Sequence, residues 1–354
     1  MPRVRAARGR DGHGPAALSG PADGPRAAWR PPPYRAPWWL PGAHAQTIWP
    51  ALCAPRPRVR LERRLWDAPD GDAIAVDWIA HDRPPAPDAP LLALFHGLEG
   101  SSRSHYAASL MAAARARGWR GAVVHFRGCG GVTGRLPRAY HSGDSDEIDW
   151  VLRRLAGRLG SAAPLYAVGV SLGANALLKW LGERGADARF VRAAAGVSAP
   201  QDLSASAAAL SRGFNRLYTR NFLSTLKAKS AAMLERHPGL FDARRLRRAR
   251  SFFDFDDLVT APLHGFAGAH DYWRRASCKP WLARIEVPTL VLNARNDPFL
   301  PERALAAANE VSGAVSLCYP RAGGHVGFAT GAPPGRLDWL PRAVLGFLED
   351  RPDG

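Results

Sequence analysis

The chain has 354 residues, 46% of them hydrophobic, and a formal net charge of +17 from 48 Lys and Arg against 31 Asp and Glu. This length allows one large domain or two modest ones, and the apolar fraction excludes wholesale disorder and a mini-protein held together by disulfides or metals. The charge suggests a nucleic-acid or anionic-membrane partner. Only four of the basic residues are lysines, however, and the arginines are spread along the chain, which is more typical of a compositional bias than of a binding patch.

The first 35 residues are rich in Arg, Gly, Pro and Ala and contain almost no large apolar residue before Trp29. Seven arginines against two aspartates give this stretch a charge of +5. It cannot bury enough apolar surface to offset the entropy of ordering it. We predict a disordered basic leader over 1–35, with a transit peptide or an early start codon as alternatives, and a folded domain over 36–350.

From residue 37 onward, an aromatic segment is followed by short apolar runs that alternate with helical patterns. Residues 37–49 are predicted to form an irregular arm packed on the domain surface. The alternation indicates an α/β fold with a mostly parallel sheet covered on both faces. Strands are expected at 73–80, 91–98, 121–126, 165–170, 192–197, 288–292 and 315–319, and helices at 106–117, 145–159, 172–183 and 303–311.

The alternation breaks between residues 201 and 283, which contain helical patterns, the arginine-rich run 244–250 and no clear strand. An insertion of this size after a strand is typical of a helical cap over the strand ends, where ligands of open α/β sheets bind. We predict such a cap over about 201–283.

The strand expected at 165–170 runs directly into Gly169-Val170-Ser171-Leu172-Gly173, which a helix follows. This is the G-x-S-x-G pattern in the strand-turn-helix context that gives it meaning. Such a turn holds the serine hydroxyl at the sheet edge near the positive end of the helix dipole, and the glycines avoid clashes with neighbouring backbone. A tight β-α turn without chemistry is the alternative, and the flanking elements favour a nucleophilic Ser171.

A serine hydroxyl is a good nucleophile only when a base accepts its proton and a third group orients that base. In α/β folds that carry a nucleophilic serine on such a strand-to-helix turn, the acid and then the histidine follow the serine along the chain. Asp297 stands just after the strand expected at 288–292, and His325 lies in a Gly-Gly-His loop after the strand expected at 315–319. We therefore predict a triad of Ser171, Asp297 and His325.

The tetrahedral intermediate of acyl transfer also needs backbone N–H donors, and each donor stabilises the transition state by roughly 3 kcal/mol. The segment beginning at His96 ends an earlier strand, where the oxyanion loop of this fold belongs. We assign the N–H groups of Leu98 and Leu172 to the oxyanion hole. His96 and Gly97 are expected to shape the turn and line the pocket without acid or base chemistry, and an ordinary strand-to-loop turn is the alternative.

Further side chains are candidates for the same sheet edge. Cys129, Tyr140 and His141 follow the strand that ends at Phe126. Tyr140 and His141 are expected to line the acyl or leaving-group pocket, whereas Cys129 is disfavoured as a nucleophile because no base is placed for it. Three acids of the predicted cap could compete with Asp297: Asp254, Asp256 and Asp257. Carboxylates in such a cap, however, more often pair with neighbouring arginines.

The four cysteines form no C-x-x-C pair and no Cys/His cluster at zinc spacing. We expect reduced thiols, no metal site and no disulfide framework. No apolar run approaches the roughly 18 residues of a membrane-spanning helix, and no apolar stretch follows the N-terminal arginines. These patterns predict a cytoplasmic protein.

With these residues in hand, the chain resembles the YheT-like α/β-hydrolases, bacterial esterases related to eukaryotic lipid-metabolising hydrolases and ethanol acyltransferases. The resemblance implies a Ser171, Asp297, His325 triad and ester hydrolysis without a cofactor. The sequence departs from the family pattern at Ala174, Asn296 and Gly130, none of which belongs to the triad. The matching segments are 38–47, 96–102, 126–129, 140–143, 169–173, 260–262, 271–272, 297–299 and 324–328.

The sequence thus favours a serine esterase acting on short- to medium-chain or lipid-derived esters. Transfer of an acyl group from acyl-CoA to an alcohol on the same triad is the alternative. A non-catalytic anion- or lipid-binding protein on a hydrolase fold is a third reading, motivated by the charge. The expected partners are a small-molecule or lipid ester and a transient membrane surface, with no nucleic acid.

Overall fold

A computed structural model describes residues 29–160 and 162–350. The leader predicted over 1–35 lies, up to residue 28, outside the described residues. Within the described ranges no helix is both long enough and apolar enough to cross a membrane.

Eight strands form one sheet in the order β1-β2-β4-β3-β5-β6-β7-β8. β1 pairs antiparallel with β2 and β2 with β4, and every other neighbouring pair is parallel. The predicted α/β class with a mostly parallel sheet is therefore confirmed. The bounds are β1 Leu61–Asp67, β2 Ala73–Ile79, β3 Leu91–Phe95, β4 Arg120–Val124, β5 Leu165–Val170, β6 Ala193–Val197, β7 Thr289–Leu292 and β8 Val315–Cys318.

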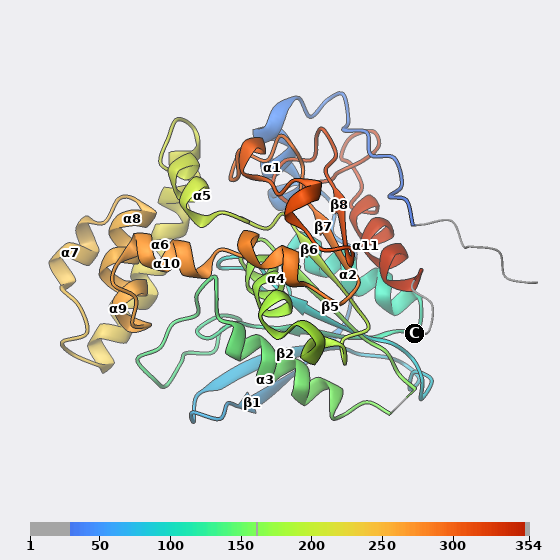
Figure 1. Ribbon diagram of the computed structural model, residues 1–354, viewed down its shortest axis with the longest axis horizontal. Coiled ribbons are helices and arrows are strands. Elements are labelled where there is room, and N and C mark those ends of the chain that lie inside the picture. Colours follow the sequence, from blue (N-terminus) through green and yellow to red (C-terminus); the bar gives the residue numbers. More distant parts are fainter. Residues whose placement is uncertain (1–28, 161, 351–354) are drawn as a thin grey trace, which may run out of the picture. The chain divides into compact units, whose positions relative to one another are not determined.

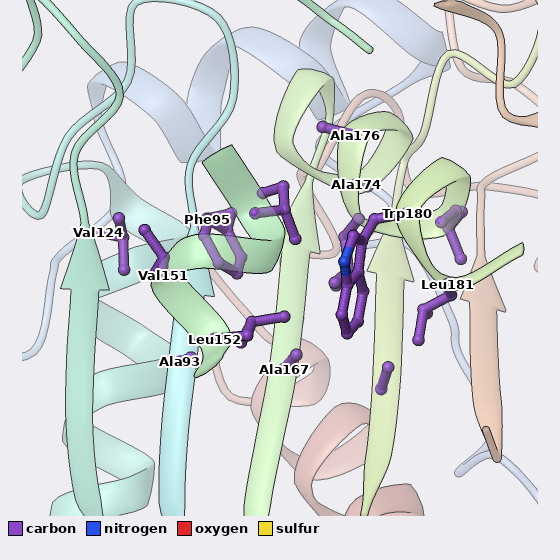
Figure 2. Close-up of a cluster of buried hydrophobic side chains, with 14 of the residues drawn as sticks. Ala93, Phe95, Val124, Val151, Leu152, Ala167, Ala174, Ala176, Trp180 and Leu181 are labelled. Carbon is purple, nitrogen blue, oxygen red and sulfur yellow. The ribbon is translucent and has the colours of Figure 1, made fainter. Parts of the chain in front are cut away.

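Helices cover both faces of this sheet (Figure 1). α2 (His105–Ala116) packs against α11 (Trp339–Glu349) on one face, and α3 (Ser145–Ala156) packs against α4 (Leu172–Arg184) on the other. Figure 2 shows Trp180 of α4 and Leu152 of α3 lying over small strand residues such as Ala167. Small residues on the strands leave room for large ones on the helices, so the two layers pack closely. The loops at the ends of the central strands therefore extend from a well-packed core.

Between β6 and β7 the chain is built of helical segments, which gather to one side of the sheet (Figure 1). Two small apolar clusters, one around Tyr272 and one around Leu258, hold them together. We call this stretch the cap segment. It comprises α5 (Leu203–Leu210), α6 (Asn215–Arg236), α7 (Ala243–Arg248), α8 (Phe252–Phe255), the π-helical turn η2 (Asp256–Thr260), α9 (Ala261–Leu263), α10 (Ala269–Ala276) and the 3-10 helix η3 (Lys279–Arg284).

The helix predicted over 303–311 is wrong, because the segment holds only the short 3-10 turns η4 (Glu302–Ala304) and η5 (Ala308–Glu310). Between them, the N–H of Ala306 donates to Oε1 of Gln201 at 2.8 Å, and Lys279 Nζ donates to the Leu305 carbonyl at 3.3 Å. These contacts with distant parts of the chain take backbone groups that a helix would use internally.

The segment predicted over 37–49 does pack on the domain, through Trp39 and Trp49, but its irregular conformation is wrong from residue 42 onward, because α1 spans Gly42–Leu52. A glycine at its start and Pro50 within it conceal this helix from a propensity argument. The edge strand β1 was not predicted, since Trp66 is its one buried residue and its sequence is strongly charged. The short 3-10 helix η1 (Gly185–Ala188) follows α4.

Candidate active site

Ser171 lies at the turn from β5 into α4 with φ 53° and ψ −118°, a backbone conformation that L-residues rarely adopt. The glycines on either side make this turn possible. A Cβ added at Gly169 would lie 2.4 Å from the Gly173 carbonyl oxygen, and one added at Gly173 would lie 2.5 Å from the Phe95 carbonyl oxygen. Neither backbone contact could be tolerated, so the tight turn lifts the Ser171 side chain out at the edge of the sheet.

The structure brings Ser171, His325 and Asp297 together in one hydrogen-bonded chain. His325 Nε2 lies 2.9 Å from Ser171 Oγ, and His325 Nδ1 lies 2.8 Å from Asp297 Oδ2. The second carboxylate oxygen accepts from the Phe299 N–H at 2.8 Å, and the Phe299 ring stacks on the imidazole with 4.2 Å between ring centres. With Asp297 accepting the Nδ1 proton, the free lone pair on Nε2 faces the serine hydroxyl.

The loop that carries His325 is held by α1, a role that the sequence analysis missed. Thr47 Oγ1 accepts the His325 N–H at 2.9 Å. Gln46 Oε1 accepts both the Gly323 N–H and the Asn296 side-chain N–H, each at 2.9 Å. The approach is so close that a Cβ at Gly327 would lie 1.8 Å from the Gln46 carbonyl oxygen. The polar Gln-Thr pair inside an otherwise aromatic segment was the available signal.

Replacing Gln46 by methionine should therefore lower kcat about tenfold with little change in KM, because two donors lose their shared acceptor and the imidazole loses its alignment. Steady-state kinetics with p-nitrophenyl butyrate checks this. Cys53→Ser, at the exposed end of the same helix, is the matched control and should leave both constants unchanged. Full activity of Gln46→Met would show that α1 does not position the histidine.

Leu98 and Leu172, whose backbone N–H groups are predicted for the oxyanion hole, line the same cavity as Ser171. In the loop after β3, the N–H of Gly97 donates to Tyr106 Oη and that of Glu99 to Tyr140 Oη, both at 2.9 Å. The intervening N–H of Leu98 and the N–H of Leu172 at the start of α4 donate to no other protein group among the described residues. They remain available for a substrate oxygen, as an oxyanion hole requires.

Two cavities meet at Ser171, and both are lined by Leu98, Phe222, Phe299 and His325. The first, which we call the cap cavity, has a volume of about 100 Å³. The remaining residues that line it are mostly apolar and come largely from the cap segment: Ser142, Leu172, Pro200, Leu203, Ser206, Ala207, Leu210, Phe252, Asp256, Tyr272 and Trp273.

The second, which we call the outer groove, has a volume of about 620 Å³ and runs between α1, α2 and α6. Leu52, Phe214 and Leu217 line it although their side chains are 76%, 48% and 56% exposed. Arg56 and Arg103 add positive charge to the same groove. The outer groove is therefore open to solvent, with an apolar and cationic rim.

Of the four residues predicted to line the pocket, only Gly97 lines a cavity that reaches Ser171. The prediction is wrong for the other three: His96 and Tyr140 are buried and line neither cavity at Ser171, and His141 lines a separate polar cavity together with Lys179. Both ring nitrogens of His96 are engaged, with the Gly97 carbonyl and the Phe126 N–H, and burial lowers its pKa to about 3. A neutral imidazole with both nitrogens occupied cannot serve as acid or base.

Among the described residues, neither the rival nucleophile nor the rival acids are hydrogen-bonded to Ser171 or His325. Burial raises the pKa of the Cys129 thiol to about 11, so it is protonated at neutral pH. Asp254 caps α8 through the backbone of Ser251, and Asp257 accepts the Ala269 N–H. Asp256 bonds to Trp273 and Thr260, so His325 has Asp297 alone as its carboxylate partner among the described residues.

A mostly parallel sheet, a strained serine turn between β5 and α4, and a Ser–His–Asp chain built on loops after β5, β7 and β8 define the α/β-hydrolase fold. The model of the alpha/beta hydrolase fold family matches residues 90–332. The chain belongs to the α/β-hydrolase family.

Comparison with named proteins narrows this class. The chain is 39% identical to "Putative esterase YheT" of Escherichia coli over 86% of its own length and 89% of that protein, which confirms the predicted YheT-like resemblance. It is 32% identical to the "Medium-chain fatty acid ethyl ester synthase/esterase 2" of Saccharomyces cerevisiae over 74% of this chain and 62% of that one. The Butyrivibrio proteoclasticus protein Est1E with bound ferulic acid superposes with a TM-score of 0.52 at 15% identity, covering 81% of this chain and 98% of that structure. The two esterase-like sequence relatives support a hydrolase, and the superposition supports the fold.

Proposed function

We propose that this hydrolase cleaves carboxylic esters through an acyl-enzyme on Ser171. The observation that carries the proposal is the position of His325, 2.9 Å from Ser171 Oγ on one side and 2.8 Å from Asp297 on the other. A base held within hydrogen-bond reach of a serine, and oriented by a carboxylate, is the arrangement that activates a hydroxyl nucleophile.

The reaction follows from these contacts. Ser171 Oγ attacks the ester carbonyl carbon while His325 Nε2 accepts the hydroxyl proton, and the N–H groups of Leu98 and Leu172 bind the carbonyl oxygen as it becomes negative. His325 then donates its proton to the leaving alcohol oxygen, and the acyl group stays on Ser171. A water molecule, deprotonated by His325, attacks the acyl-enzyme carbonyl; the bond to Ser171 Oγ then breaks, His325 returns the proton to Ser171, and the acid is released. Asp297 stabilises the imidazolium in both halves of the cycle.

The two cavities divide the substrate between them. After the first half-reaction the alcohol must leave and water must enter, which requires a path to solvent. The outer groove, with exposed Leu52 and Leu217 at its rim, provides that path. We therefore assign the alcohol portion to the outer groove and the acyl chain to the cap cavity.

The volume of the cap cavity predicts a short acyl chain. At about 100 Å³ it is smaller than the ~150 Å³ apolar cavity that holds a benzene molecule. Along a series of p-nitrophenyl esters, kcat/KM should peak near butyrate and fall about tenfold by decanoate, because additional methylenes cannot be buried. Phe252→Ala should shift the optimum to longer chains, while Phe253→Ala, on the exposed side of the same turn, should not. A rate that rises steadily to decanoate would contradict this assignment.

Acyl transfer is a second candidate, favoured by the yeast relative, which is named as both an ethyl ester synthase and an esterase. An alcohol entering the outer groove would take the place of water in the second half-reaction. Product analysis with ethanol and a short acyl-CoA distinguishes the two: we expect free acid as the main product, and an excess of ethyl ester would favour the transferase.

A further inference from the structure

The cap cavity contains one carboxyl group among mostly apolar neighbours. Asp256 is 9% exposed and lines this cavity together with Leu203, Leu210 and Phe252. It is the first residue of η2, a π-helical turn in which the Ala261 N–H donates to the Asp256 carbonyl oxygen. Single π-helical turns are rare and frequently occur at functional sites, since they redirect the side chains that they carry.

The contacts of this carboxylate leave part of its hydrogen-bonding capacity unused. Oδ2 accepts from Trp273 Nε1 at 2.8 Å and Oδ1 accepts from Thr260 Oγ1 at 2.7 Å. A carboxylate can accept about four hydrogen bonds, and no cation pairs with Asp256 within the part of the chain that the structure describes. Burial raises the pKa of Asp256 to about 6, so the group is mostly ionised at neutral pH and is costly to leave incompletely satisfied.

A second unused polar group lines the same cavity. Ser206 of α5 is 5% exposed, and its hydroxyl has no hydrogen-bond partner among the described residues. Buried hydroxyls in folded proteins nearly always find a partner, so an orphan at a substrate cavity calls for an explanation. A ligand that both donates to a carboxylate and accepts from a hydroxyl would satisfy Asp256 and Ser206 together.

We propose that Asp256 and Ser206 recognise a hydroxyl group on the acyl chain, so that the preferred substrates are esters of short hydroxy acids. An alcohol hydroxyl is both a donor and an acceptor, which matches the two groups. An ammonium group has no acceptor for the Ser206 proton, and its desolvation among apolar side chains costs far more than that of a hydroxyl. A free carboxylate would be repelled by Asp256. This proposal rests on the ester hydrolysis proposed above.

The test compares matched ester pairs that differ by one hydroxyl: ethyl butyrate with each enantiomer of ethyl 3-hydroxybutyrate, and ethyl hexanoate with ethyl 6-hydroxyhexanoate. Acid release is followed by pH-stat titration. For the wild-type protein, kcat/KM of the hydroxylated ester should exceed that of its partner about tenfold in at least one pair, as expected for a hydrogen bond to a charged group. In Asp256→Asn and in Ser206→Ala this ratio should fall towards one.

Thr219→Val is the matched control, because it removes a buried side-chain hydrogen bond of the cap segment, to the Leu210 carbonyl, without lining the cavity. In this control, the ratio of kcat/KM for the hydroxylated ester to kcat/KM for its partner should equal the wild-type ratio. A general weakening of the cap would instead change this ratio in all three variants alike. Near-UV circular dichroism shows whether each variant is folded. If Asp256→Asn does not fold, the comparison of Ser206→Ala with the wild-type protein is the test.

Two results would overturn the inference and are distinguishable from each other. Hydrolysis of plain esters with no preference for any hydroxylated partner, or a preference that survives both substitutions, refutes the hydroxyl site and leaves the esterase proposal intact. Absence of hydrolysis for every ester refutes the proposed function, and the inference falls with it.

Discussion

Ser171→Ala should lower kcat/KM for p-nitrophenyl butyrate by a factor of about 10⁴ or more, to a rate close to the uncatalysed background. The hydroxyl removed is the one that lies 2.9 Å from His325, and without it no acyl-enzyme can form. The substitution deletes one oxygen from a site at the cavity surface, so circular dichroism and the melting temperature should change little.

The matched control for this variant is Ser142→Ala. Ser142 lines the same cap cavity, but among the described residues no histidine is bonded to its hydroxyl in the way that His325 is bonded to Ser171. Its loss should change kcat/KM less than tenfold. A folded Ser171→Ala protein that keeps a tenth of the wild-type rate, or a Ser142→Ala protein that loses all activity, would refute the assignment of the nucleophile.

Asp297→Asn should lower kcat by about 10⁴ with KM nearly unchanged, because the asparagine NH₂ group can face His325 Nδ1 and favours the tautomer whose Nε2 cannot accept the serine proton. The change is isosteric, and one side-chain oxygen can still accept the Phe299 N–H. Initial-rate kinetics over a range of p-nitrophenyl butyrate concentrations separates kcat from KM.

Asp254→Asn tests the rival view that an acid of the cap segment completes the triad. Asp254 is exposed, and its carboxylate accepts the backbone N–H groups of Arg250 and Ser251, so this variant should hydrolyse the ester at the wild-type rate. If Asp254→Asn were inactive and Asp297→Asn active, the acid would have been misassigned.

Sequence reasoning was most successful where the chemistry is local. The turn around Ser171 is determined by a few consecutive residues, because only glycine fits beside the Gly173 and Phe95 carbonyl oxygens. Asp297 and His325 could be located because each follows a parallel strand, and such strand ends meet at one edge of the sheet. The structure places His325 within hydrogen-bond distance of both Ser171 and Asp297.

Sequence reasoning was least successful where the role of a residue depends on partners that are distant in the chain. The support that Gln46 gives to Gly323 spans 277 positions of the chain, and the local signal, a polar Gln-Thr pair in an aromatic segment, does not say which distant loop it holds. The helix predicted over 303–311 satisfies the propensity rules but loses backbone groups to Gln201 and Lys279. Tyr140 and His141 follow a strand that ends at the correct edge, yet neither residue lines a Ser171 cavity, and side-chain direction is not readable from spacing.

The central claim, that the reaction passes through an ester bond to Ser171, is tested most directly by intact-protein mass spectrometry of the wild-type protein quenched with acid during turnover of p-nitrophenyl butyrate, followed by peptide mapping. A protein species heavier by one butyryl group, with the modification on the peptide that contains Ser171 and absent from Ser171→Ala, is the predicted result. Steady hydrolysis with no acylated protein, or acylation that persists in Ser171→Ala, would contradict it.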